Sequence, residues 1–168
     1  FNDTATTEIY TGEDTLSLHD ALPIYIKDAV QTPAFQLLIY PATDMTQSRE
    51  SQVENAAGPI LTAPVMKWFI DHYMPENSDM KAELASPLFS PDSLLKGAPP
   101  ALIITAQYDP LRDEGEEYGR RLIANGVTTS MVRYHGMFHV FFGMLGLFAD
   151  ADTAHSLAAS MTAKALSM

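Results

Sequence analysis

Two runs of the chain, AFQLLIYP at 34–41 and PALIITA at 100–106, are apolar at consecutive rather than alternate positions. Such runs are typical of strands that are buried on both faces, as in a parallel sheet. A third strand, rich in β-branched residues, is predicted at 128–134. Helical patterns lie at 112–126 and 152–166. This strand, helix, strand, helix order predicts an α/β fold with a parallel sheet and a right-handed crossover.

The composition indicates the class of protein. A length of 168 residues suits one domain, and 46% apolar with 18% charged residues is typical of a folded globular chain. The formal charge of −11 argues against nucleic acid or anionic lipid as a partner. The chain has no cysteine, which excludes disulfides and thiolate metal sites, and no apolar stretch approaches the roughly 20 residues of a membrane span. We therefore expect a chain without a membrane span, and we favour a cytoplasmic location.

Residues 1–24 differ in composition from the rest of the chain. They hold five acidic residues and no Lys or Arg, and they lack a sustained apolar period and the basic start of a signal peptide. Residues 2–24 resemble one reading frame of an adapter oligonucleotide used in short-read sequencing, in the halves NDTATTEIY and DTLSLHDALPI. We interpret residues 1–24 as a non-native leader, with a natural polar arm as the alternative. Ser17, His19 and Asp20 are therefore set aside as site residues, and residues 25–168 are expected to be a piece of a longer protein.

The long segment between the first two strands, residues 42–99, exceeds what a simple crossover needs. Within it, Thr62 is expected to cap a helix that has Pro64 in its first turn. One face of that helix is apolar and carries Met66, Phe69, Ile70 and Tyr73. Such an insertion often builds a lid or pocket wall, and ordinary core packing is the alternative for each of these side chains.

Two polar residues follow neighbouring elements of the predicted sheet. Asp109 comes after the strand at 101–106 and His139 after the strand at 128–134, so both loops leave the carboxyl edge of the sheet. Parallel strands lie roughly 4.8 Å apart, or about twice that with one strand between, and either spacing lets a carboxylate reach an imidazole. A histidine that acts as a general base needs such a carboxylate to fix its tautomer. Taken alone, Asp109 suits a turn before proline and His139 suits a core histidine.

Four segments make a more specific resemblance: FQLLIYPATD, SPLFSPD, PPALIITAQYDPLRDEGEEYGRRLIANGV and RYHGMFHVFF. Together they resemble the C-terminal half of the hormone-sensitive-lipase-like, acetyl-esterase-like carboxylesterases of the α/β-hydrolase fold. The resemblance implies the C-terminal part of a doubly wound, mostly parallel sheet at 25–168, with a partial helical cap at 42–85. It implies that Asp109 is the acid and His139 the base of a Ser-His-Asp triad, with Trp68 and Phe69 near the acyl pocket. The implied substrate is a small-molecule carboxylic ester, with no metal and no organic cofactor.

The sequence departs from that family at the nucleophile. The family's G-x-S-x-G elbow occurs nowhere in the chain, and neither does the His-Gly-rich oxyanion loop. Both are expected upstream of Tyr25. In subtilisin, loss of the serine alone costs about as much activity as loss of the whole triad. We therefore expect these 168 residues alone to be inactive, and a non-catalytic ligand-binding member of the fold, like the plant gibberellin receptors, is the alternative.

The other polar residues of the types that catalysis uses fit structural or surface roles. Asp113 and Glu114 suit the first turn of a helix, and no Gly-rich phosphate loop follows any strand. The remaining histidines and their neighbours fit surface, cap or structural positions: His72 with Asp71, His135, and His155 with Asp152. Three serines lie in a Pro-rich loop without a glycine elbow and are not candidate nucleophiles: Ser86, Ser90 and Ser93.

Overall fold

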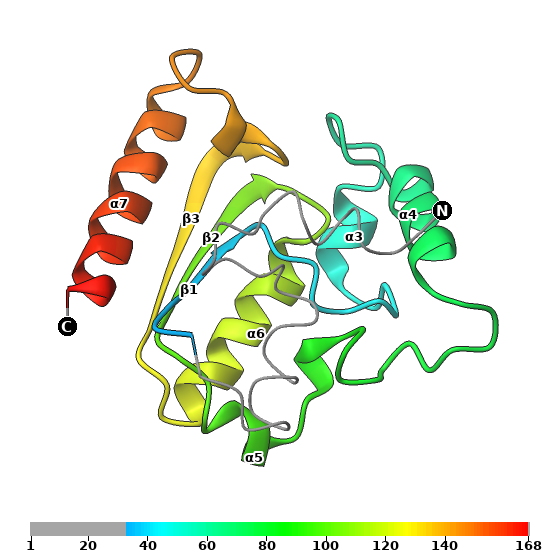
Figure 1. Cartoon of the computed structure of the whole chain (residues 1–168). Coiled ribbons are helices and arrows are strands. Elements are labelled where there is room, and N and C mark those ends of the chain that lie inside the picture. The colour runs from blue at the N-terminus through cyan, green and yellow to red at the C-terminus, as the bar shows by residue number, and fades with distance from the viewer. Residues whose placement is uncertain (1–32, 168) are drawn as a thin grey trace.

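The computed structural model describes residues 33–167, which form a three-stranded sheet with helices on both faces (Figure 1). The strands are β1 (Gln36–Ile39), β2 (Ala101–Tyr108) and β3 (Thr129–Phe138). They lie in the order β1-β2-β3, and both pairings are parallel. The predicted α/β fold with a parallel sheet is confirmed. The segment interpreted as a leader, residues 1–24, lies outside the described residues.

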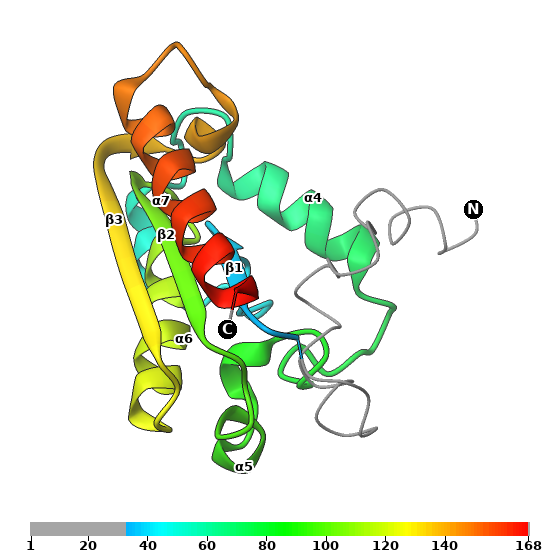
Figure 2. The same cartoon turned by 60° about the vertical axis from the view of Figure 1, so that its left-hand side comes forward.

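The helices divide between the two faces of the sheet. With their bounds they are α3 (Glu50–Glu54), α4 (Ala63–Tyr73), η1 (Pro87–Phe89), α5 (Asp92–Leu95), α6 (Arg112–Ala124), η2 (Phe141–Gly143) and α7 (Ala149–Leu166). Helix α6 lies behind the sheet in the view of Figure 1, whereas Figure 2 shows α7 in front of β1 and β2. The layers are therefore helix, sheet, helix.

The central strand β2 explains this layering. Its first six residues are buried, because side chains on both faces meet a helix. Ile103 packs with Tyr118 and Leu122 of α6, whereas Leu102 and Ile104 pack with the alanines of α7. Successive side chains of a strand point to opposite faces, so a strand covered on both sides reads as one continuous apolar run.

The ends of α6 follow the local signals in the sequence. Asp113 and Glu114 lie in its first turn and Arg121 in its last, which suits the helix dipole. Gly126 follows the C-cap residue Asn125 with a φ of +82°, a left-handed conformation that glycine adopts without steric cost. Helix α6 therefore lies within the helical pattern expected at 112–126 and ends just before Gly126.

Helix α4 also begins as predicted. The Thr62 side chain accepts a hydrogen bond from the Val65 N–H at 3.4 Å, and a proline occupies the first turn. Its apolar face, however, is not a core face along its whole length. Met66 packs with Leu61 and Leu111, while Phe69 is 57% exposed. Ordinary core packing therefore holds for Met66 and is wrong for Phe69, because α4 contacts this core cluster through one side chain.

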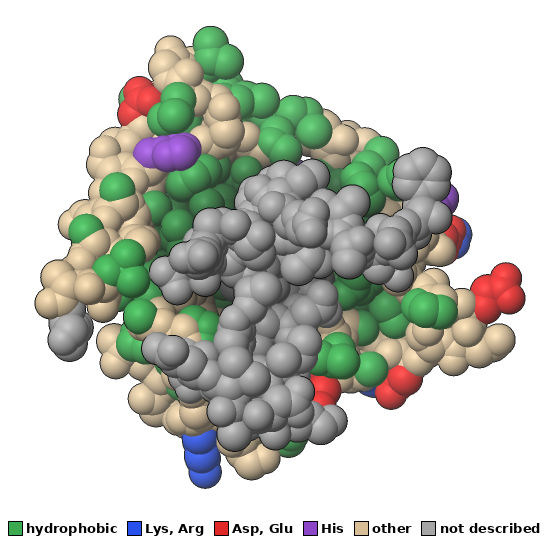
Figure 3. All heavy atoms as spheres, in the orientation of Figure 1, with side chains coloured by type: hydrophobic (Ala, Val, Ile, Leu, Met, Phe, Trp, Pro, Cys, Tyr) green, Lys and Arg blue, Asp and Glu red, His purple; other side chains and the backbone are tan. Residues whose placement is uncertain are grey.

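Figure 3 shows one face of the molecule with exposed hydrophobic side chains over α7 and toward α4. The large exposed ones at these two helices and the loop before α7 include Trp68, Phe69, Leu145, Leu147 and Leu166. Exposed apolar side chains gathered on one face mark a surface that another part of a protein or a ligand can cover.

Candidate active site

The structure brings Asp109 and His139 together. Asp109 directly follows β2 and His139 directly follows β3, and these strands pair in parallel, so their carboxyl ends meet at one edge of the sheet. The His139 Nδ1 atom lies 2.8 Å from the Asp109 Oδ2 atom. The contact predicted from strand order is therefore present.

The Asp109 carboxylate is held by groups on its own turn as well. Its side chain is fully buried, and Oδ1 accepts a hydrogen bond from the Leu111 N–H at 2.9 Å. Because an ionised carboxylate has only acceptors, Oδ2 binds the imidazole when Nδ1 carries the proton. The lone pair of the neutral ring then lies on Nε2, which is the arrangement a general base requires.

An aromatic ring from the end of the remaining strand, β1, also packs against the imidazole of His139. Tyr40 directly follows β1, and its ring centroid lies 4.5 Å from that of His139. Val140, next to the histidine, has a φ of +71°, which is unusual for a β-branched residue. Strained backbone of this kind is often found at functional sites. Residues after all three strands thus meet around one histidine, whose side chain is 17% exposed.

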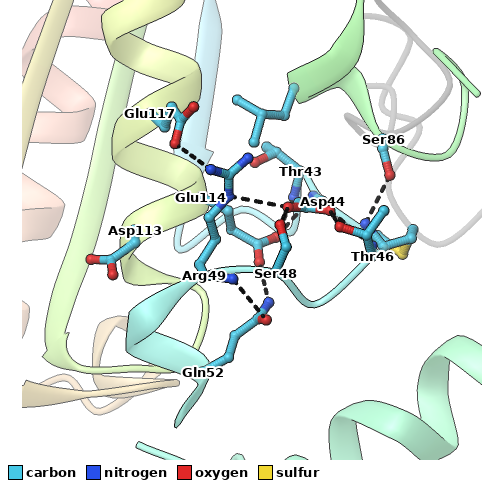
Figure 4. A network of polar contacts seen from close by, with 12 residues as sticks. Thr43, Asp44, Thr46, Ser48, Arg49, Gln52, Ser86, Asp113, Glu114 and Glu117 are labelled. Carbon is cyan, nitrogen blue, oxygen red and sulfur yellow. Dashed lines mark hydrogen bonds and ion pairs between the residues drawn. The ribbon is translucent and has the colours of Figure 1, made fainter. Parts of the chain in front are cut away.

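A second polar cluster lies where α6, α3 and the loop after β1 meet (Figure 4). Glu114 is fully buried and accepts hydrogen bonds from the N–H groups of Thr43 at 2.6 Å and Asp44 at 3.0 Å, and from Gln52 Nε2 at 2.7 Å. Burial raises the pKa of Glu114 to about 8. The hydrogen bonds from the Thr43 and Asp44 N–H groups lower this pKa, but their effect is smaller than that of burial. The sequence placed Glu114 at a helix terminus and missed this role, because its partners come from distant segments.

Asp44 is the other buried carboxylate of the cluster. Burial alone would raise the pKa of Asp44, but hydrogen bonds from Thr46 and Ser48 and the charge of Arg49 hold it below its ordinary value. The Arg49 guanidinium also binds Glu117 on α6 at 2.7 Å. The FQLLIYPATD segment ends at Asp44, which is the one sequence signal that could have marked this position.

The other polar residues considered in the sequence lie in structural or surface positions. Ser86 is buried between the chain segments that it joins, since its Oγ accepts from the Met45 N–H and donates to the Met80 carbonyl. His155 stacks on Phe142 with ring centroids 3.7 Å apart. Three further residues lie on exposed or local positions: His135 on β3, His72 bonded to the Trp68 carbonyl, and Asp71 paired with Lys67. None of them joins the Asp109–His139 pair.

Two negative findings apply to the described part of the chain. Residues 33–167 contain no group of three or more His, Asp or Glu side chains that could hold a metal ion. Nor does any helix in this range combine the length and apolar character that crossing a bilayer requires.

Trp68 and Phe69, expected near the acyl pocket, lie on α4. Both are more than half exposed, and their rings touch edge to face with centroids 5.1 Å apart. They are available to line a surface, but in residues 33–167 they do not pack on the Asp109–His139 pair.

The chain has clear relatives. Residues 16–143 match the alpha/beta hydrolase fold family, a match that begins inside the segment interpreted as a leader. An esterase from Gibberella moniliformis is 35% identical over 84% of this chain and 42% of the relative. Carboxylesterase NlhH from Mycobacterium tuberculosis is 40% identical over 74% of this chain and 40% of the relative.

A solved structure agrees with these relatives. An ester hydrolase from the metagenome of Lake Arreo superimposes with a TM-score of 0.81 at 38% identity, covering 88% of this chain and 46% of that protein. The chain spans about two fifths of the length of the curated relatives named above. With the parallel sheet and the family match together, the chain belongs to the α/β-hydrolase fold family.

Proposed function

We propose that the chain is the C-terminal part of a carboxylic ester hydrolase of the hormone-sensitive-lipase-like branch. Asp109 and His139 are the acid and base of its Ser-His-Asp triad. The observation that carries this proposal is the 2.8 Å contact between a fully buried carboxylate and an imidazole at the carboxyl edge of a parallel sheet. The relatives that match the chain include esterases and carboxylesterases, which supports the same chemistry.

The proposed reaction is acyl transfer. His139 Nε2 takes the proton of a serine hydroxyl as its oxygen attacks the ester carbonyl, and Asp109 stabilises the imidazolium that forms. The histidine then gives this proton to the departing alkoxide, which leaves as an alcohol, and the acyl group remains on the serine. A water molecule, activated by the same imidazole, releases the carboxylic acid. Small or medium acyl chains are the expectation, and no metal or organic cofactor is part of the proposal.

The serine of this reaction belongs to a segment other than these 168 residues, because no G-x-S-x-G elbow occurs in them. We further propose that residues 42–85 form part of a cap, with the exposed rings of Trp68 and Phe69 facing the acyl site of the whole enzyme. Residues 1–24 remain, in this proposal, a leader that does not belong to the enzyme.

The DNA upstream of the Tyr25 codon, read from an independent preparation, tests the proposal. We expect an open frame that encodes a G-x-S-x-G elbow in place of the leader. An uninterrupted frame that encodes residues 1–24 with no elbow upstream would contradict both the leader and the triad.

The isolated chain offers a second test. We expect the purified 168-residue chain to show no turnover of a fluorogenic short-chain ester above the rate of free imidazole. Turnover that the substitution His139→Ala removes would mean that these residues hold their own nucleophile.

A further inference from the structure

Glu114 is a buried titratable group that the proposed reaction does not use. Its three hydrogen-bond partners are donors without charge: the N–H groups of Thr43 and Asp44, and the Gln52 amide. The guanidinium of the same cluster is engaged elsewhere, since Arg49 pairs with Asp44 and Glu117. Burying a carboxyl group is costly unless its oxygens are hydrogen-bonded, so these three bonds offset the cost of burying Glu114.

The bonds of Glu114 join three segments that are far apart in the sequence. Thr43 and Asp44 lie in the loop after β1, Gln52 lies in α3, and Glu114 itself lies in the first turn of α6. Figure 4 shows these segments converging on the carboxyl group. The two backbone N–H donors are buried, and buried N–H groups need an acceptor. Loss of Glu114 would therefore remove the bonds that join both the loop and Gln52 of α3 to this carboxyl group, and would leave two buried N–H groups without this acceptor.

Helix α3 lies against the turn that carries Asp109. The Ser51 hydroxyl donates to the Pro110 carbonyl at 2.7 Å, and Asn55 Nδ2 lies 3.4 Å from the Asp109 carbonyl. The Asp113 carboxylate accepts from the Ser51 N–H at 2.8 Å, which closes the contact from the α6 side. The position of α3 thus affects the backbone of Asp109 and Pro110.

The loop after β1 lies against the other member of the pair. It starts at Tyr40, whose ring packs on His139, and three residues later it reaches the Thr43 N–H held by Glu114. One carboxyl group therefore bonds to both the segment that packs on the imidazole and the helix that contacts the Asp109 turn.

We infer that Glu114 is a positioning residue, which acts through the loop after β1 and through α3 to keep Asp109 and His139 in hydrogen-bonding register. The inference rests on the proposed function, because only there do Asp109 and His139 have a role in the reaction. Its test reads the state of the imidazole and not catalysis, so that failure of one proposal is distinguishable from failure of the other.

The test uses the 168-residue chain labelled with ¹⁵N-histidine, and long-range ¹H–¹⁵N NMR reads which nitrogen of His139 carries the proton. A His139→Gln variant assigns the signals. We expect one Nδ1–H tautomer in the unsubstituted chain, and loss of this single pattern in Glu114→Ala. Glu114→Gln restores it, because the amide oxygen can still accept from the two backbone N–H groups. Glu117→Ala, which removes a partly exposed partner of Arg49 on the same helix, is the matched control and leaves the pattern unchanged.

Circular dichroism shows whether each variant is folded. Glu114→Asp serves as a second variant, since its shorter side chain cannot span the loop and α3 together, and we expect it to lose the single pattern while it folds. Folded Ala and Asp variants that keep the single Nδ1–H tautomer would overturn the inference. So would loss of the fold in both, because Glu114 would then serve the stability of the domain as a whole.

Discussion

At the scale of single residues, the tautomer of one imidazole depends on the group opposite Nδ1. The Asp109 carboxylate can only accept a hydrogen bond, and it is oriented by the Leu111 N–H. An amide in its place can present its NH₂ group instead, which leaves the ring proton on Nε2. The Nε2 lone pair, which the proposed reaction uses as proton acceptor, would then be lost without a change of shape.

The substitution Asp109→Asn tests this dependence. We expect the neutral form of His139 to change from the Nδ1–H to the Nε2–H tautomer, as read from ¹⁵N chemical shifts. Asp71→Asn, which alters an exposed carboxylate on α4, serves as the control and should leave His139 unchanged. If the Asp109→Asn variant retains the Nδ1–H tautomer, Asp109 does not set the orientation of the ring.

Glu114 has a measurable effect on stability as well. Its pKa in the folded chain, about 8, lies above its ordinary value of 4.5. The stability that Glu114 contributes is therefore fully present below about pH 4.5, and it is lost as the pH rises toward and through 8.

Glu114→Gln removes this proton and keeps the shape of the neutral acid. Between about pH 5 and 8 the unfolding free energy of the original chain should fall relative to the Gln variant, by up to about 1.4 kcal/mol per pH unit. Urea unfolding at several pH values measures this difference, and carboxylates that do not interact with Glu114, such as Glu116, cancel because both proteins contain them. Parallel stability curves would contradict a raised pKa at Glu114.

At the scale of elements, glycine marks the end of α6 for a reason of backbone geometry alone. A Cβ at Gly126 would meet no atom within 4 Å, so that crowding plays no part, but the φ of +82° disfavours any L side chain. Gly126→Ala should lower the unfolding free energy by about 1 kcal/mol. Gly143→Ala, where a Cβ is equally free and φ is not left-handed, should change it little. Equal effects in thermal or urea unfolding would contradict this explanation.

The elements themselves were largely predictable because their signals are local. The buried runs of β1 and β2, the Thr62 cap of α4 and the Gly126 end of α6 were read from neighbouring residues. The end of β3 was not. The strand was expected to stop at 134 and continues to Phe138, because a register shift between Ala106 and Tyr108 lets Tyr108 pair with Phe138. That pairing depends on the partner strand, so the residues near 134–138 carry no local sequence signal for it.

At the scale of the whole molecule, long-range contacts limited what the sequence could predict. The Asp109–His139 contact was foreseen because strand order places both at one edge of the sheet. The partners of Glu114 lie 62 to 71 positions away, in a loop and a short helix whose placement no local pattern indicates. The exposed side of α4 has the same origin, since amphipathic spacing shows a face and not what covers it.

The sheet also has consequences for the whole molecule. Among the described residues, β1 pairs with β2 on one side only. An edge strand with consecutive apolar residues is a site where another strand can pair. In the proposed function, the strand that pairs with this edge of β1 belongs to the part of the hydrolase sheet that these residues do not include.

The central claim is that Asp109 and His139 work as the acid and base of an esterase. A chimera tests it most directly, with residues 25–168 replacing the matched part of carboxylesterase NlhH from Mycobacterium tuberculosis, to which the chain is 40% identical over 129 residues. We predict that the folded chimera hydrolyses a short-chain ester, that His139→Ala lowers kcat/KM by several orders of magnitude, and that His155→Ala does not. A folded chimera without turnover, or one whose turnover survives His139→Ala, would contradict the account.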